Sequence, residues 1–180
     1  MSLKLRSRLA LRLDAEIAAA SAVPARAAVL QAQRAILWLR HGRDADAREE
    51  LDRLHAGALL HPRVELAAWL HLAQGLMAYF GAFSGFGGGA RERVRRARVM
   101  AAAARLRPLQ ALADAWLAQM DFVGRDIDSL IAHAQAALAM LGPDDHGAGY
   151  RVATALASAW SLAGGEAAAS PWYAWARQHA

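Results

Sequence analysis

The chain has 180 residues, of which 47 are alanine, 20 are arginine and none is cysteine or asparagine. This length suits a single domain with its own hydrophobic core, and the lack of cysteine excludes disulfide bonds, thiolate nucleophiles and cysteine-based metal sites. The formal net charge of +5 is concentrated in residues 91–107, which carry +6 while all other residues together carry −1.

The composition predicts an all-α fold, because alanine is the strongest helix former and runs rich in β-branched residues are missing. Five prolines punctuate the chain, and glycine turns lie roughly midway between them, as expected where helices begin and end. The turns at 42–46 and 124–128 are near copies, each with a glycine to end one helix and acids to begin the next. Together these signals predict helices over 4–20, 25–41, 44–57, 63–82, 89–106, 108–123, 126–141, 147–163 and 167–179.

The helical segments also have apolar faces. Over 108–123 and 126–141, apolar residues recur at the i, i+3, i+4, i+7 spacing of one helix face. Trp116 lies within the first of these stripes, so we expect it in the core. We expect one domain over 1–180, with an N-terminal helix or cap over 1–23 and helix-pair units over 24–61, 62–107, 108–142 and 143–180.

The repeated order of helix, glycine turn, helix and proline is typical of helical solenoids. The segment containing Trp69, Leu70, Gly75 and Tyr79, followed by Ala103 and Pro108, resembles a divergent tetratricopeptide repeat, and so does the segment with Trp116, Leu117, Ala137, Gly142 and Pro143. The resemblance implies antiparallel helix hairpins stacked as a right-handed superhelix of about three to four helix pairs.

The last third of the chain is similar to degenerate repeats of bacterial signalling proteins. That similarity covers Asp144, Asp145, His146, Tyr150, Arg151, Trp160 and the segment after Pro171. Because such arrays often accompany an output domain, the similarity implies that this chain belongs to a larger bacterial regulatory protein.

The C-terminal segment contains three aromatic residues, Trp172, Tyr173 and Trp175, and almost no charge. An array normally ends in a cap with a polar outer face. These residues therefore either form an interface, with a partner or a second copy of the chain, or pack back on the helix at 147–163.

The arginine-rich segment has two interpretations. Helical spacing places Arg91, Arg95, Arg98 and Arg105 on one side, where they could bind a phosphate, a carboxylate or an acidic partner. Alternatively, they pair with acids such as Asp114 and Asp121 of the next helix. We do not expect nucleic-acid binding, which favours a wider basic surface.

The glycine loop at 85–89 precedes this basic helix and is the longest of the predicted turns. Phe83 and Phe86 make it a candidate contact loop. A glycine loop before a helix can also hold a phosphate, but a dinucleotide-binding or P-loop site would need a preceding strand, and the P-loop also needs a lysine. The second interpretation is a simple turn between helices.

We predict no catalytic residue, metal site or cofactor, because the histidines and acids lack the required spacings. Basic residues interrupt the N-terminal apolar stretch, which argues against a signal peptide and for a cytoplasmic protein without a membrane partner. We therefore expect a non-catalytic protein-interaction or sensory module, with a protein or peptide partner of acidic character. The alternative is a sensor of a small anionic ligand that uses the glycine loop 85–89 and the arginine helix 91–107.

Overall fold

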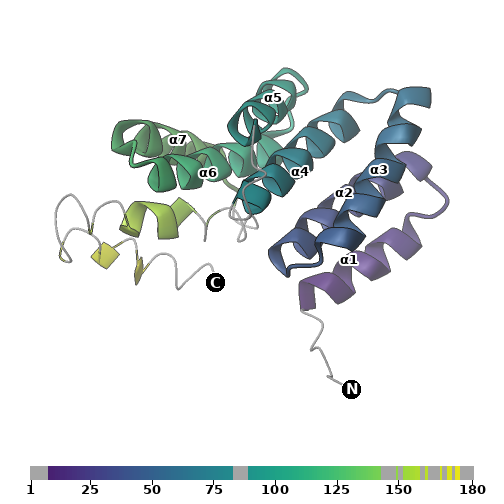
Figure 1. Ribbon diagram of the computed structural model, residues 1–180, viewed down its shortest axis with the longest axis horizontal. Helices are drawn as coiled ribbons and strands as arrows, with labels where there is room; N and C mark the ends of the chain where they lie inside the picture. Colours follow the sequence, from purple (N-terminus) through teal and green to yellow (C-terminus); the bar gives the residue numbers. More distant parts are fainter. Residues whose placement is uncertain are drawn as a thin grey trace. The chain divides into compact units, whose positions relative to one another are not determined.

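The computed structural model describes residues 8–82 and 89–142 and, beyond these, short stretches of which 152–158 is the longest. The described elements are helices, and no strand occurs among them, so the all-α prediction is confirmed. The helices shown in Figure 1 are α1 (Arg8–Ala19), α2 (Pro24–Arg40), α3 (Asp44–Leu60), α4 (Val64–Ala82), α5 (Ala90–Ala103), α6 (Arg107–Gly124) and α7 (Ile127–Met140), and residues 152–158 are also helical.

The predicted helices agree with these bounds to within a few residues where the structure describes them. The predicted segments at 147–163 and 167–179 are described only in part. The chain divides into two compact units, Met1–Arg93 (unit 1) and Val94–Ala180 (unit 2), with the boundary inside α5. This boundary falls within the predicted helix pair 62–107 and not at either of its ends.

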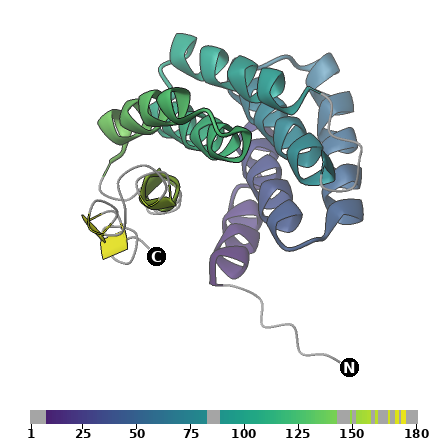
Figure 2. The same ribbon diagram turned by 60° about the vertical axis from the view of Figure 1, so that its left-hand side comes forward.

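Unit 1 is built around α2. This helix packs against α1, α3 and α4, and α3 also packs against α4, as both ribbon views show (Figures 1 and 2). The inner side of α3 presents Ala47, Leu51 and Leu54, which recur every three or four residues, while most of its other side chains are exposed. Consecutive helices therefore pack together, as expected for an array of hairpins.

Unit 2 contains the closely packed pair α6 and α7. Small side chains dominate their contact, so the helices can approach closely. Trp116 is buried, as predicted from its apolar stripe. The same core extends to the helical stretch 152–158, and its buried members are Ala115, Ala118, Leu130, Ala134, Ala137, Val152 and Leu156.

The two near-copy turns end their helices differently. In the first, Gly42 has a φ of +68° and the Arg43 N–H donates to the Trp38 carbonyl over 2.9 Å, as in a Schellman cap. In the second, Gly124 is still helical and Arg125 takes the left-handed position at a φ of +59°. The prediction of a glycine cap is therefore wrong by one residue there, whereas Asp126 caps α7 by accepting from the Ser129 N–H.

Two glycine substitutions should have opposite effects on stability. Gly57 lies within α3 and a Cβ atom there would meet nothing within 4 Å, so Gly57→Ala should raise the free energy of unfolding by about 0.5–1 kcal/mol. Gly42→Ala should lower it by about 1 kcal/mol, because an L-residue is strained at a φ of +68°. Urea unfolding measures both changes. A destabilising Gly57→Ala would contradict the open space around Gly57 in α3, and a neutral Gly42→Ala would contradict the left-handed backbone of Gly42.

Candidate partner-binding site

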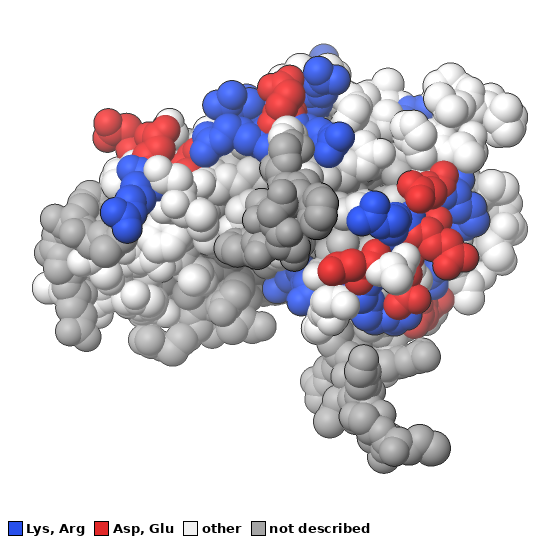
Figure 3. All heavy atoms as spheres, in the orientation of Figure 1, with Lys and Arg blue, Asp and Glu red and all other residues white. Residues whose placement is uncertain are grey.

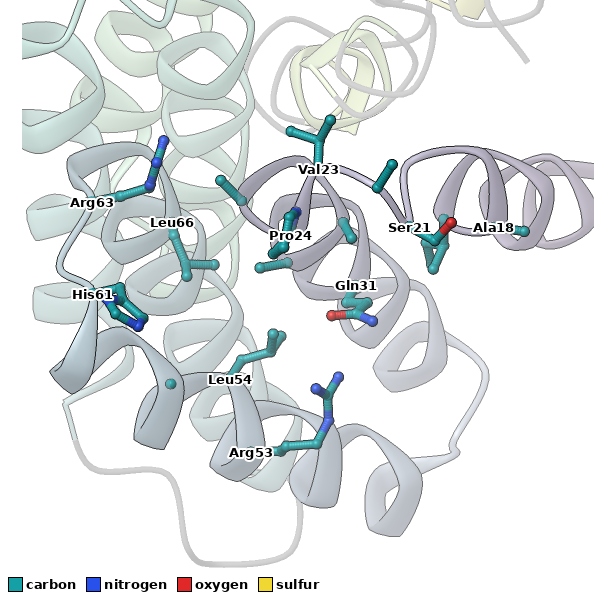
Figure 4. A pocket seen from close by; sticks show the side chains of 16 residues that line it. Ala18, Ser21, Val23, Pro24, Gln31, Arg53, Leu54, His61, Arg63 and Leu66 are labelled. Carbon is teal, nitrogen blue, oxygen red and sulfur yellow. The ribbon is translucent and has the colours of Figure 1, made fainter.

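An open groove of about 920 Å³ lies in unit 1 (Figure 4). One wall comes from the end of α1, the following turn and the first turns of α2. The other wall comes from the second half of α3 and the start of α4. The groove therefore lies among segments that are up to about fifty positions apart in the sequence.

The wall formed by α1 and α2 is mostly apolar and made mainly of small side chains, with Ser21 and Gln31 as its polar members. Pro24 begins α2, and the residue before a proline is restricted to extended backbone, which holds Val23 in the turn and leaves it exposed. Leu54 and Leu66 reach into the groove from the opposite wall (Figure 4). The alanines of the first wall are Ala18, Ala22, Ala25, Ala27 and Ala28.

The wall formed by α3 and α4 carries the charge. Arg53, His61 and Arg63 line it (Figure 4), and none of the described residues that line the groove is acidic. The Arg53 guanidinium donates to Glu50 over 2.9 Å. Within the described part of the chain, His61 and Arg63 have no ion-pair partner, so the Arg63 guanidinium leaves positive charge available at the rim.

Large apolar side chains flank this rim. Leu59 and Leu60, which end α3, are 74% and 76% exposed, and Val64 at the start of α4 is 53% exposed. They are the sequence neighbours of His61 and Arg63. Grouped exposed apolar residues with a polar border are typical of interaction surfaces.

An ion-pair network fixes the helices that form the groove. Arg34 of α2 donates to Asp14 of α1 over 3.2 Å and to Glu50 of α3 over 2.8 Å. The Arg34 and Arg43 guanidiniums each lie 4.6 Å from the ring centre of Trp38, in the range of cation–π contacts. Because these contacts join α1, α2 and α3, they set the spacing of the two walls.

Unit 2 has its own buried polar contacts. The Arg98 Nε–H of α5 donates to Asp114 Oδ1 over 2.6 Å, and the Asp114 side chain is fully buried in α6. About two helical turns further along α6, Asp121 Oδ2 lies 2.6 Å from His133 Nδ1 of α7. Burial raises the pKa of Asp114 above its ordinary value, against the opposing effects of the Arg98 hydrogen bond and of the Arg98 and His133 charges.

These contacts decide between the two interpretations for Arg98, which pairs with Asp114 as the structural interpretation predicts. The binding role of Arg91 and Arg95 stays a prediction; Arg95 is exposed, and basic side chains gather over α5 in Figure 3. The prediction that Arg105 shares their helix face is wrong, because α5 ends at Ala103 and Arg105 has a φ of +57°.

Several predicted contact residues lie outside the described residues. These are Phe83 and Phe86, positions 85–88 of the glycine loop, and Trp172 and Trp175. Tyr173 is described and exposed, and its hydroxyl lies 3.3 Å from Ser161 Oγ, within the predicted helix 147–163. The anion-sensor and aromatic-interface hypotheses therefore stay predictions.

Sequence reasoning missed the groove. One indication of it is present in the sequence. Two apolar residues, Leu59 and Leu60, follow the apolar stripe of α3 and stand directly before His61, Pro62 and Arg63. The alanine wall gave no signal, because alanine is abundant throughout the chain.

No family model matches the chain, and neither a curated protein nor a solved structure does. The described residues contain no group of three His, Asp or Glu side chains that could hold a metal ion. None of the described helices combines the length and apolar character needed to cross a membrane. The candidate site therefore rests on the geometry of the groove itself.

Replacing Arg98 should destabilise the protein far more than replacing Arg95. Arg98→Met keeps an apolar stem but leaves the buried Asp114 carboxyl without its donor, so the free energy of unfolding should fall by about 2 kcal/mol. Arg95→Met removes an exposed side chain of the same helix and should change it by less than about 0.5 kcal/mol. Equal effects in urea unfolding would show that the Arg98 contact contributes nothing to folding.

The raised pKa of Asp114 has a definite consequence for stability. When the pKa of a carboxyl is higher in the folded than in the unfolded protein, the folded state loses stability as the pH rises. The loss begins near the unfolded pKa of 3.8 and ends above the folded pKa. Wild-type protein should therefore lose free energy of unfolding over this pH range relative to Asp114→Asn, and the difference should level off above it. If the wild type instead gains stability over this range, attraction to Arg98 outweighs the cost of burial.

Proposed function

We propose that this chain is a non-catalytic protein-interaction module whose unit 1 groove binds a segment of a partner. The observation that carries the proposal is the open groove between an alanine-rich wall and a basic wall. A partner segment would bury the apolar surface, which supplies most binding free energy, while the rim charges select the partner.

The exposed leucines beside the groove support the same function. Leu59 and Leu60 extend the apolar surface beyond the groove itself, over a corner where α3 turns into α4. A surface of this kind costs solubility unless a partner covers it. His61 and Arg63 lie in this corner and line the groove, so one partner could contact apolar and charged groups together.

The finer fold assignment belongs to the same proposal. We take the chain to be a right-handed, tetratricopeptide-like array of three to four helix pairs, in the cytoplasm, as part of a larger bacterial regulatory protein. The packing of α2 on α3 and α4, with α3 also on α4, supports it, because each helix pair of such an array packs on the next.

Selection from a displayed random peptide library tests the proposed function. Peptides selected on the full chain should bind at least about tenfold more weakly to Ala25→Trp, which fills the groove. Ala45→Trp is the matched control, because Ala45 is likewise the second residue of its helix but is exposed outside the groove. Both variants should keep the wild-type thermal midpoint.

Two results would contradict the proposal. One is that no peptide is enriched on the full chain. The other is that enriched peptides bind Ala25→Trp as tightly as they bind wild type and Ala45→Trp, since their site would then lie elsewhere.

A further inference from the structure

We infer that the occupant of the groove is an amphipathic helix of a partner protein, with small apolar residues facing α2 and carboxylates facing Arg63 and His61. This inference rests on the proposed function and adds the conformation and the charge of the bound segment. It follows from the shape of one wall and the charge of the other.

The alanine-rich wall favours a helix as the bound segment. Ala25 and Ala28 are one turn apart on α2, and Ala18 and Ala22 continue the small-residue surface onto α1 and the turn. Side chains this short allow another helix axis to approach to about 8 Å, near the lower limit of helix packing. Leu54 and Leu66 line the far side of the groove (Figure 4) but are largely buried, so they offer the bound helix an apolar surface to pack against and not projecting side chains.

Charge sets the composition of that helix. Arg53, His61 and Arg63 all lie on the wall formed by α3 and α4, across the groove from Val23 and Pro24 (Figure 4). Arg53 pairs with Glu50, which it shares with Arg34. Arg63 has no ion-pair partner within the described residues, so it is the strongest remaining attraction for a carboxylate.

These two features together specify the mode of binding. An amphipathic helix in a groove buries its apolar face and leaves its polar face at the rim. Only the wall formed by α3 and α4 is basic, so the bound helix needs acidic residues only along the edge that faces this wall. A basic helix would place like charges against Arg63, at a cost in affinity.

Synthetic peptides of about 15 residues, long enough to form a helix, test the inference. The first has alanine and leucine on one face and glutamate along its edge; the second has lysine in place of glutamate; the third is the first with a central proline. Fluorescence anisotropy with the full chain should show binding of the first peptide, which weakens with salt. The second and third should bind at least about tenfold more weakly.

Charge reversal at the rim identifies the contact. Arg63→Glu should weaken binding of the glutamate peptide by about tenfold, whereas Arg48→Glu should change it by less than about twofold. Arg48 is the matched control, because it is an exposed arginine on the side of α3 away from the groove and its reversal changes the net charge equally. Equal effects of the two variants would mean that only net charge matters, and would overturn the inference.

The remaining outcomes separate this inference from the proposed function. Equal binding of the glutamate and lysine peptides, or undiminished binding of the proline peptide, overturns the acidic-helix assignment. If none of the three binds while library peptides still bind in a manner sensitive to Ala25→Trp, the groove is a binding site for another kind of segment. If light scattering shows a dimer that Ala25→Trp dissociates, the occupant is a second copy of the chain.

Discussion

Close packing between alanine-rich helix faces is the constraint on which this structure depends. Short side chains at the contact of α6 with α7, and Ala32 and Ala35 on α2, let neighbouring helices lie near each other. A core of this kind buries little apolar area per residue, so larger side chains such as Leu51, Leu76 and Trp116 supply much of its hydrophobic stabilisation. Small side chains of α1 and α2 also form one wall of the open groove in unit 1.

Ion pairs complement this packing by joining helices that alanine alone would hold weakly. Arg34 connects three helices of unit 1, and in unit 2 Asp114 and Asp121 of α6 contact Arg98 of α5 and His133 of α7. Such pairs specify which helices meet, because a misplaced helix would leave a buried carboxylate without a partner. An arginine that the sequence suggests as a binding residue, such as Arg98, can therefore serve to hold two helices together.

The sequence predicted the elements well because proline, glycine and the helical spacing of apolar residues act over a few positions. Trp116 was placed in the core from that spacing alone. The groove could not be predicted, since it needs the end of α1 and the end of α3 to flank α2. Likewise, Arg105 left the predicted helix face because α5 stopped early, and Asp121 contacted a histidine because the choice of partner depends on tertiary packing.

Packing between consecutive helices also bears on how the chain folds. Each helix of unit 1 contacts the next along the chain, and the pairing of α2 with α4 spans only one intervening helix. Contacts between near neighbours close short loops, and chains with such contacts generally fold faster than those with distant pairings. The α6–α7 hairpin needs only a short loop to form, so it is suited to nucleate the folding of unit 2 before the rest of that unit is in place.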